Sequence, residues 1–326
     1  MQQQLLKKSD SQMIKGIAIL SVIMSHMSYI MELPTKMELL IHPLGYLGVS
    51  LFLGISGYGC AISIKDKRWE SRLKFLVHRI KKIVPLLATV TFVSILIAYI
   101  VYNQKYDALN ILVNMLGISN SIGRFTWYIG CQYFWYIIVI LLWVKRLNWC
   151  WIGTIVVYFI SILVNCPEIQ FNMWGLNSIS FPIGVWIALY EDVINKNIKF
   201  KKKKTILFSF IIWILLFVIC YFVLGNPEDL KIQNLFKSFI SALFIIVIFE
   251  VFFLFRIENL FIGKILKFIG NISYELYLVH GFWVFLLYDF FEPIKLWKIM
   301  IYIAGSFLIS LFIHRIYNRK IIIMRY

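Results

Sequence analysis

Charged residues are scarce in this sequence. They make up 15% of its 326 residues, while hydrophobic residues make up 61%. Ordinary soluble domains are about a quarter charged and about half apolar. The composition therefore excludes a water-soluble globular protein and predicts a chain whose solvent is lipid. Because no hydrophilic stretch is long enough to fold separately, residues 1–326 are predicted to form a single membrane domain.

Acidic residues and paired cysteines are also lacking. Asp and Glu number 16 against 33 Lys and Arg, which gives a net charge of +17. A nucleic-acid partner is not expected, because such binders gather their basic residues on a solvated domain. The five cysteines form no C-x-x-C pair and show no His/Cys ligand spacing. Neither a disulfide framework nor a metal site is predicted.

Long apolar runs dominate the rest of the chain. No small-residue cleavage site follows the first run, which indicates a retained anchor rather than a removed signal peptide. Crossing about 30 Å of hydrocarbon takes about 20 helical residues. The sequence thus predicts an all-α, polytopic bundle of about ten transmembrane helices. The predicted spans cover residues 14–31, 46–64, 84–102, 127–144, 149–165, 178–190, 205–224, 235–255, 271–291 and 299–314.

The distribution of basic residues predicts the orientation of this bundle. Alternate connections carry 26 and 7 of the 33 Lys and Arg. The positive-inside rule therefore places both termini in the cytoplasm of a multi-pass protein of the cell membrane, which in bacteria is the cytoplasmic membrane. The lysines at 201–204 are most simply anchors against anionic lipid.

The first predicted span carries two basic residues on one face. Lys15 and His26 are separated by eleven positions, which is almost three helical turns or about 16 Å. An imidazole inside the oily stretch 16–30 is costly, so His26 is a candidate functional residue.

A second histidine is predicted at a similar depth. Ser273, Tyr277 and His280 fall at i, i+4 and i+7 of the ninth span, with His280 about 13 Å into the membrane. Two histidines at matching depth favour a shared polar cavity, because lipid-facing imidazoles are poorly tolerated. The alternative is that each histidine only bonds a neighbouring helix.

Two further segments carry candidate binding residues. Arg79, Lys81 and Lys82 precede Pro85 on an amphipathic approach to the third span, where Pro85 fits a first turn whose amides are unpaired. This basic rim suits the phosphates of a nucleotide-like cofactor, and plain lipid anchoring explains it equally well. The aromatic segment 127–136 begins at the outer face and fits an interfacial belt. The small residues of segment 54–57 favour close helix packing.

These pieces together resemble acyltransferase family 3, the integral-membrane acyltransferases that modify cell-surface polysaccharides and related acceptors. The similarity covers nearly the whole chain. Six motifs carry it: Lys15 with His26, the segment 48–58, the basic residues and proline of 79–85, the aromatic segment 127–136, the segment 181–184, and Ser273-Tyr274 through Tyr277 to His280. The family usually has Arg at the positions of Lys15 and Lys82 and Glu at the position of Gln132. Lysine lacks the planar bidentate fork of arginine, and glutamine cannot act as a base.

The resemblance implies transfer of an acyl group, usually acetyl from acetyl-CoA, to a hydroxyl of a surface polysaccharide or a lipid-linked sugar. On this hypothesis His26 is the general base. The other candidate residues divide into three groups: oxyanion donors Tyr277, Ser273 and His280; acyl-CoA ligands Lys15, Arg79, Lys81 and Lys82; and acceptor contacts Trp127, Gln132 and Tyr136.

Two other functions stay open from the residues. A transporter or flippase would use His26, His280 and the intramembrane carboxylate Glu250 as a substrate or proton pathway. No inverted halves with matching interrupted helices support that reading. A non-catalytic partner of a polysaccharide assembly system is the second alternative, which Gln132 favours.

Overall fold

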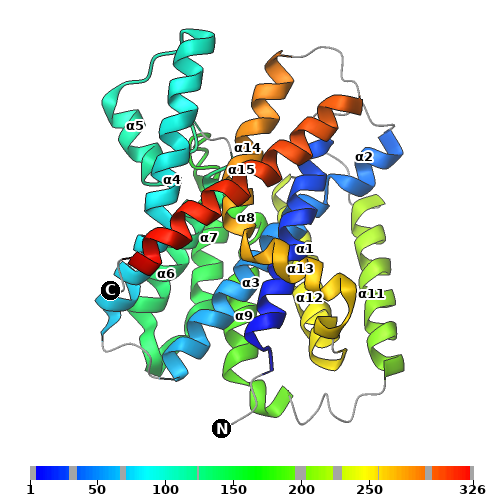
Figure 1. Cartoon of the computed structure of the whole chain (residues 1–326). Coiled ribbons are helices and arrows are strands. Elements are labelled where there is room, and N and C mark those ends of the chain that lie inside the picture. Colours follow the sequence, from blue (N-terminus) through cyan, green and yellow to red (C-terminus); the bar gives the residue numbers. More distant parts are fainter. Residues whose placement is uncertain are drawn as a thin grey trace.

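The computed structural model describes residues 5–28, 35–66, 71–122, 125–194, 203–222, 230–255, 257–290 and 296–323. Within these ranges all regular elements are helices, which confirms the all-α prediction. The α-helices are α1 (Lys8–Met27), α2 (Thr35–Ile41), α3 (Leu44–Lys65), α4 (Arg72–Tyr102), α5 (Ala108–Met115), α6 (Trp127–Arg146), α7 (Trp151–Leu163), α8 (Phe171–Leu176), α9 (Ser180–Leu189), α11 (Lys203–Phe222), α12 (Leu230–Leu254), α13 (Phe261–Asn271), α14 (Ser273–Phe290) and α15 (Leu296–Ile323) (Figure 1).

Each of the ten predicted spans contains a helix. Four helices among the described residues are long and apolar enough to cross a membrane: α3, α4, residues 234–254 of α12 and residues 299–317 of α15. The apolar helices Trp127–Trp143 and Leu147–Leu163 are shorter. The structure therefore supports a membrane protein, while the number of ten spans and the cytoplasmic side of both termini stay predictions.

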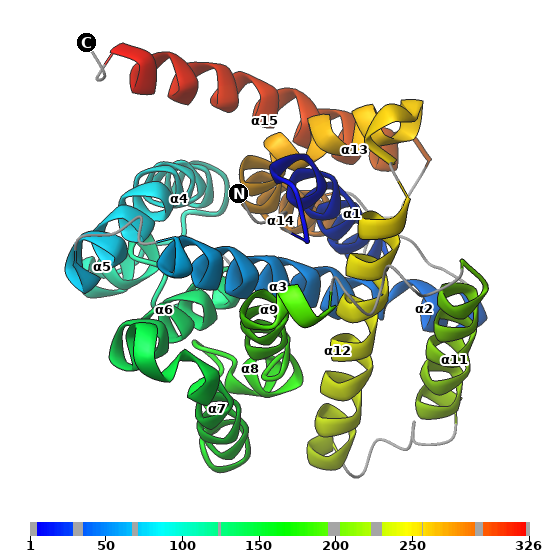
Figure 2. The same ribbon diagram turned by 90° about the horizontal axis from the view of Figure 1, so that it is seen from below.

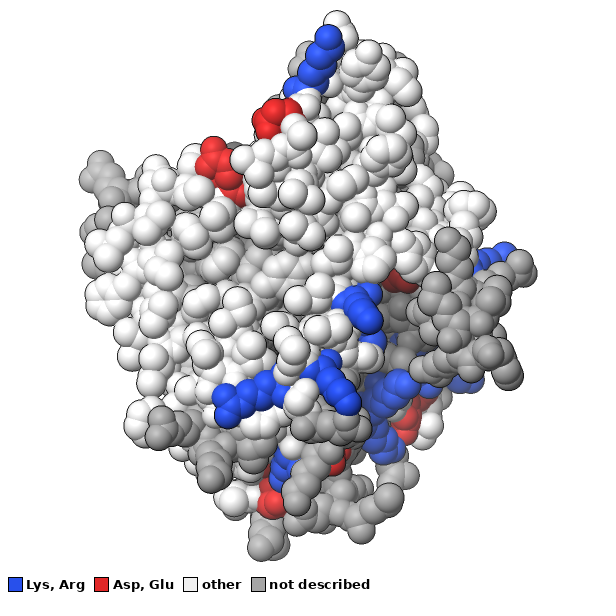
Figure 3. Space-filling view, turned by 90° about the vertical axis from the view of Figure 1, so that its left-hand side faces the viewer, with Lys and Arg blue, Asp and Glu red and all other residues white. Residues whose placement is uncertain are grey.

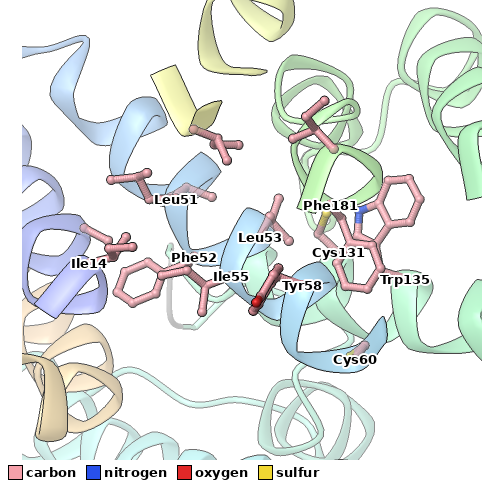
Figure 4. Packing of buried hydrophobic residues seen from close by; sticks show 14 of the residues in the cluster. Ile14, Leu51, Phe52, Leu53, Ile55, Tyr58, Cys60, Cys131, Trp135 and Phe181 are labelled. Atoms are coloured by element: carbon pink, nitrogen blue, oxygen red, sulfur yellow. The ribbon is translucent and has the colours of Figure 1, made fainter. Parts of the chain in front are cut away.

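Helix α3 lies at the centre of the bundle. It packs most extensively against α9 and α1, and it also contacts α12 and α6. Seen from below, α1, α13 and α14 lie on one side of α3, and α6, α8 and α9 lie on the other (Figure 2). Figure 4 shows the core around it, where Phe52 of α3 faces Ile14 of α1, and the stacked rings of Trp135 and Phe181 lie on the opposite side.

Glycines let the central helices approach backbone to backbone. A Cβ atom on Gly184 of α9 would meet the carbonyl oxygen of Gly54, and one on Gly57 of α3 would meet that of Phe181. The close approach predicted from segment 54–57 is thus confirmed, with α9 as the partner. Glycines hold α1 against α13 in the same way, because Cβ atoms on Gly16 and Gly270 would each meet a backbone carbonyl of the opposite helix.

We expect Gly184→Val to destabilise the bundle. The added side chain must displace the α3 backbone at Gly54, and overpacking of this kind costs about 1–3 kcal/mol. The thermal unfolding midpoint of the purified protein in detergent should fall. Gly59→Ala is the matched control, since a Cβ atom there meets nothing within 4 Å and alanine favours the helix. Equal midpoints for Gly184→Val and wild type would contradict this account of the α3–α9 interface.

Pro85 lies deep inside α4, not in a first turn as predicted from the sequence. The helix begins at Arg72, where the Ser71 hydroxyl accepts a hydrogen bond from the Lys74 amide at 3.2 Å, and it runs without interruption to Tyr102. The amphipathic approach and the predicted third span are therefore one helix. Because proline has no N–H, the carbonyl of Lys81 lacks its usual helical partner at this point.

The outer segment after α4 forms the short helix α5, which lies beside the upper part of α4 in Figure 1. Leu109 and Leu112 are exposed, while the Asn114 side chain is buried and donates to Asn110 and Ser121. An exposed apolar face over an internally bonded polar face is typical of a helix that lies in the membrane interface.

The lower end of α1 is fixed to the turn that precedes α13. Glu258 accepts hydrogen bonds from the Lys7 ammonium at 2.9 Å and from the Ser9 hydroxyl at 2.7 Å. These two donors hold the pKa of Glu258 below its usual range, the Lys7 bond having the larger effect. The contact, together with the α1–α13 glycines, sets the height of the α1 face that carries Lys15 and His26.

Candidate active site

A cavity of about 140 Å³ lies where five helices meet, α1, α3, α4, α6 and α14. Five residues that the sequence singled out from separate motifs line it together: Lys15, Gln132, Tyr136, Ser273 and Tyr277. The rest of its wall is Phe52, Ser56, Ile83, Tyr128, Ile129 and Tyr274. The cavity therefore collects polar groups from four of the six motifs, since Ser56 belongs to the segment 48–58, and aromatic and aliphatic side chains surround them.

The two intramembrane histidines are in direct contact. His26 lies in the last turn of α1, and its Nδ1 is 2.9 Å from Nε2 of His280 on α14. His280 is fully buried, and its Nδ1 is 2.7 Å from the carbonyl oxygen of Leu276. Helix geometry had placed the two rings at similar depth, and the structure joins them in one hydrogen-bonded chain that ends on the α14 backbone.

The hydrogen bonds from His26 through His280 to Leu276 determine which nitrogen of each neutral ring carries the proton. A carbonyl oxygen only accepts, so Nδ1 of His280 must donate to Leu276. Nε2 of His280 then carries a lone pair and accepts from Nδ1–H of His26. The lone pair of His26 is consequently on Nε2. The arrangement gives His26 the protonation state of a general base and directs its basic nitrogen away from His280.

Phe125 and Tyr277 connect the cavity to the histidine pair. The Phe125 ring stacks on His26 with centroids 3.8 Å apart and planes within 22°. The Tyr277 hydroxyl donates to the backbone carbonyl of Phe125. Tyr277 also lines the cavity, and its ring centroid is 5.8 Å from that of His280. One layer of aromatic side chains therefore separates the cavity from His26. Phe125 had no sequence signal, because it precedes α6 and belongs to no periodic pattern.

Cations gather at the opposite end of the cavity. The Arg79 guanidinium lies 5.1 Å from the ring centroid of Phe75 and 5.7 Å from that of Tyr136, which lines the cavity. The charges of Arg79 and Lys82 act on the Lys15 ammonium inside the cavity. Among the described carboxylates, none forms an ion pair with Lys15 or Arg79. This end thus holds positive charge that an anionic ligand can neutralise.

Lys81 and Lys82 are exposed on α4 near Arg79. Figure 3 shows the face that carries α4 and α5: its centre is almost free of charged side chains, and Lys and Arg gather over its lower part. An uncharged belt beside a basic rim is the pattern expected at the edge of a bilayer.

Gln132 is the most unusual polar group of the cavity wall. Its side chain is 3% exposed, and although it lies close to Tyr136, neither its amide oxygen nor its amide nitrogen has a partner at hydrogen-bond geometry. Gln132 and Tyr136 were assigned to acceptor contacts near the outer face. The structure instead places both in the wall of the cavity, with Tyr136 next to Arg79.

The aromatic segment 127–136 does not form an exposed interfacial belt, contrary to the prediction. Trp127, Trp135 and Tyr136 are buried inside the bundle, and Trp127 packs edge to face on Tyr128 without reaching the cavity wall. An aromatic segment has the same composition whether its side chains face lipid headgroups or the protein interior. The sequence alone therefore does not distinguish the two placements. Glu250 is buried in α12 and is likewise outside the cavity wall.

The fold and the site define a helical membrane protein with a polar cavity between a basic rim and a histidine pair. The model of the acyltransferase domain of acyltransferase family 3 matches residues 10–315, and the chain therefore belongs to this family. It is accordingly a membrane acyltransferase. Comparison with curated proteins gives no match.

Proposed function

We propose that this protein transfers an acyl group, acetyl from acetyl-CoA, to a hydroxyl of a cell-surface polysaccharide or of a lipid-linked sugar. The family supports acyl transfer in general. The hydrogen-bonded chain from His26 through His280 to the Leu276 carbonyl carries the proposal, because it leaves the lone pair of His26 on Nε2. An alcohol is a poor nucleophile until a nearby base can take its proton.

The acyl donor binds from the basic side. In this proposal its phosphates contact Arg79 and Lys82, with Lys81 adding positive charge at the rim. The thin carrier arm passes Lys15 and occupies the cavity, and the thioester lies beyond Tyr277 near His26. The cations gathered at this end and the aromatic side chains of the cavity wall support this placement.

The reaction requires one proton transfer and one exchange of bonds at the carbonyl carbon. Nε2 of His26 takes the proton of the acceptor hydroxyl as the oxygen attacks the thioester carbonyl. The tetrahedral intermediate then collapses, the carbon–sulfur bond breaks, and the thiolate of CoA leaves with the bonding electrons. The imidazolium of His26 returns its proton to that thiolate. The products are the O-acyl acceptor and the free thiol.

His280 is assigned as a positioning residue, not as a donor to the oxyanion. Its only N–H is engaged by Leu276, and its other nitrogen accepts from His26. While His26 holds the extra proton, His280 and the carbonyl behind it stabilise the positive charge. Ser273 lies seven residues earlier on α14, about 10 Å from His280. Its hydroxyl is therefore assigned to a contact with the carrier arm of the acyl donor, not to the oxyanion. Tyr277 holds the Phe125 carbonyl against the histidine pair.

Replacing Arg79 and Lys82 together by glutamine is expected to raise KM for acetyl-CoA about 10²- to 10⁴-fold with a smaller change in kcat. Each lost charge-assisted hydrogen bond is worth about 1.5–3 kcal/mol. The readout is the dependence of initial transfer rate on acetyl-CoA concentration. Lys105→Gln removes an exposed charge at the other end of α4 and should leave KM unchanged. An unchanged KM in the double variant would remove the basic rim from donor binding.

Proteoliposomes test the function itself. They are loaded with labelled acetyl-CoA inside and supplied with candidate glycans outside. Label on the glycan supports the transferase. Glycan movement without labelling identifies a transporter, and the absence of both leaves a non-catalytic partner; either result contradicts the proposal.

A further inference from the structure

Gln132 lacks hydrogen-bond partners in a protein interior where nearly all buried polar groups have them. The residue is 3% exposed and both polar atoms of its carboxamide are buried and unsatisfied, although it lies in the wall of a cavity. A buried group in this state destabilises the fold unless something else bonds it. A ligand that binds in the cavity should therefore offer this side chain both a hydrogen-bond donor and a hydrogen-bond acceptor.

The position of Gln132 on α6 narrows the choice of occupant. Tyr136, Gln132 and Tyr128 follow one another at intervals of four residues and all line the cavity, so each step along this face is about 6 Å. Tyr136 contacts Arg79 at the basic end, and Tyr128 contacts Tyr277 below the histidine pair. A chain that runs from the basic residues toward His26 passes Gln132 near the middle of its course.

The cavity fits a thin, mostly apolar chain with isolated polar groups. Its volume of about 140 Å³ has room for about ten water-sized groups. Phe52, Ile83 and Ile129 supply apolar wall, while Lys15 supplies a cation. A neutral carboxamide in the middle of this course is poorly matched to a phosphate and well matched to an amide.

We infer that Gln132 recognises the secondary amides in the carrier arm of the acyl donor. The N–H and the carbonyl of a trans amide point in opposite directions. The carboxamide of Gln132 therefore accepts through its oxygen from the N–H of one amide and donates through its nitrogen to the carbonyl of the other. This inference rests on the proposed function, because acyl-CoA is the donor whose pantetheine arm carries two such amides. Gln132 is thus a specificity-determining residue that selects an amide-bearing thioester over a plain alkyl thioester of equal length.

The test compares two donors in wild type and in Gln132→Met, which keeps the length of the side chain and removes its hydrogen bonds. The donors are S-acetylpantetheine and an analogue of equal length in which methylene groups replace both amides. Wild type should prefer the amide donor about 10- to 100-fold in kcat/KM, as expected for two buried hydrogen bonds. Gln132→Met should lose that preference by slowing the amide donor alone. An equal loss with both donors, or a preference that survives the substitution, overturns the inference.

A stability measurement accompanies the kinetics. Without ligand, Gln132→Met should melt at the same temperature as wild type or higher, because it removes two unsatisfied polar atoms. S-acetylpantetheine should raise the melting temperature of wild type more than that of the variant. A variant that melts lower without ligand would mean that Gln132 bonds ordered water in the resting protein, and the inference would fall. Failure of the proposed function is distinguishable, since wild type would then transfer no acetyl from acetyl-CoA itself.

Discussion

His26→Gln is expected to lower kcat for acyl transfer about 10²- to 10⁴-fold, the range that a positioned general base contributes. Glutamine has nearly the same reach and keeps an N–H that can bond His280, but it has no nitrogen that takes a proton at neutral pH. Binding of acetyl-CoA should change little, because the basic residues and the cavity lie below His26. The measurement is single-turnover transfer in proteoliposomes together with donor binding.

A matched substitution at another histidine tests whether the loss of activity is specific to His26 or follows the loss of any histidine. His42 is exposed outside the cavity wall, and His42→Gln should keep wild-type kcat. Full activity in His26→Gln would remove this residue from the chemistry. If weaker binding of acetyl-CoA accounted for the whole loss of activity in His26→Gln, His26 would belong to the donor-binding site and not to the chemical step.

His280→Leu is expected to lower kcat about 100-fold or more while KM for the donor stays close to wild type. Leucine cannot accept from Nδ1–H of His26, so the ring loses both its tautomer control and the partner that stabilises its positive charge. In serine proteases, loss of the group that orients the catalytic imidazole costs about 10⁴-fold in the same way. His280→Gln should recover part of the rate, because its carboxamide oxygen is an acceptor.

A spectroscopic readout distinguishes positioning from simple packing. With ¹⁵N-labelled histidine, His26 should show the Nδ1-protonated tautomer in wild type and a mixture of tautomers in His280→Leu. If His280→Leu and His280→Gln lose the same activity and leave the His26 signal unchanged, the hydrogen-bond chain has no part in the reaction.

Helix periodicity alone predicted much of this site. The eleven-residue spacing of Lys15 and His26 placed them on one face, and the structure puts Lys15 in the cavity wall and His26 against the histidine of α14. Depth along the ninth span predicted that His280 lies level with His26. The contact of the two histidines follows from helical rise and from the poor tolerance of lipid for ionisable groups. Neither ring lines the cavity, so the shared polar cavity that the sequence favoured for them is not seen among the described residues.

Other features depend on tertiary contacts that a single sequence does not specify. Phe125 stacks on His26 from a position before α6, so no helical pattern indicated it. The direction of Gln132 depends on which face of α6 meets α1 and α14. A single sequence does not specify that face, and the sequence analysis assigned Gln132 to acceptor contacts. Pro85 was expected to mark a helix start, but the amphipathic turns before it continue into the same helix.

Mass spectrometry of surface glycans tests the central claim most directly. Cells that carry the wild-type chain, cells that lack it and cells that carry His26→Gln at equal membrane levels are compared. The account predicts a glycan that is heavier by one acetyl group only in the wild-type cells. The same acetylated glycan in cells with His26→Gln, or in cells without the chain, would contradict it.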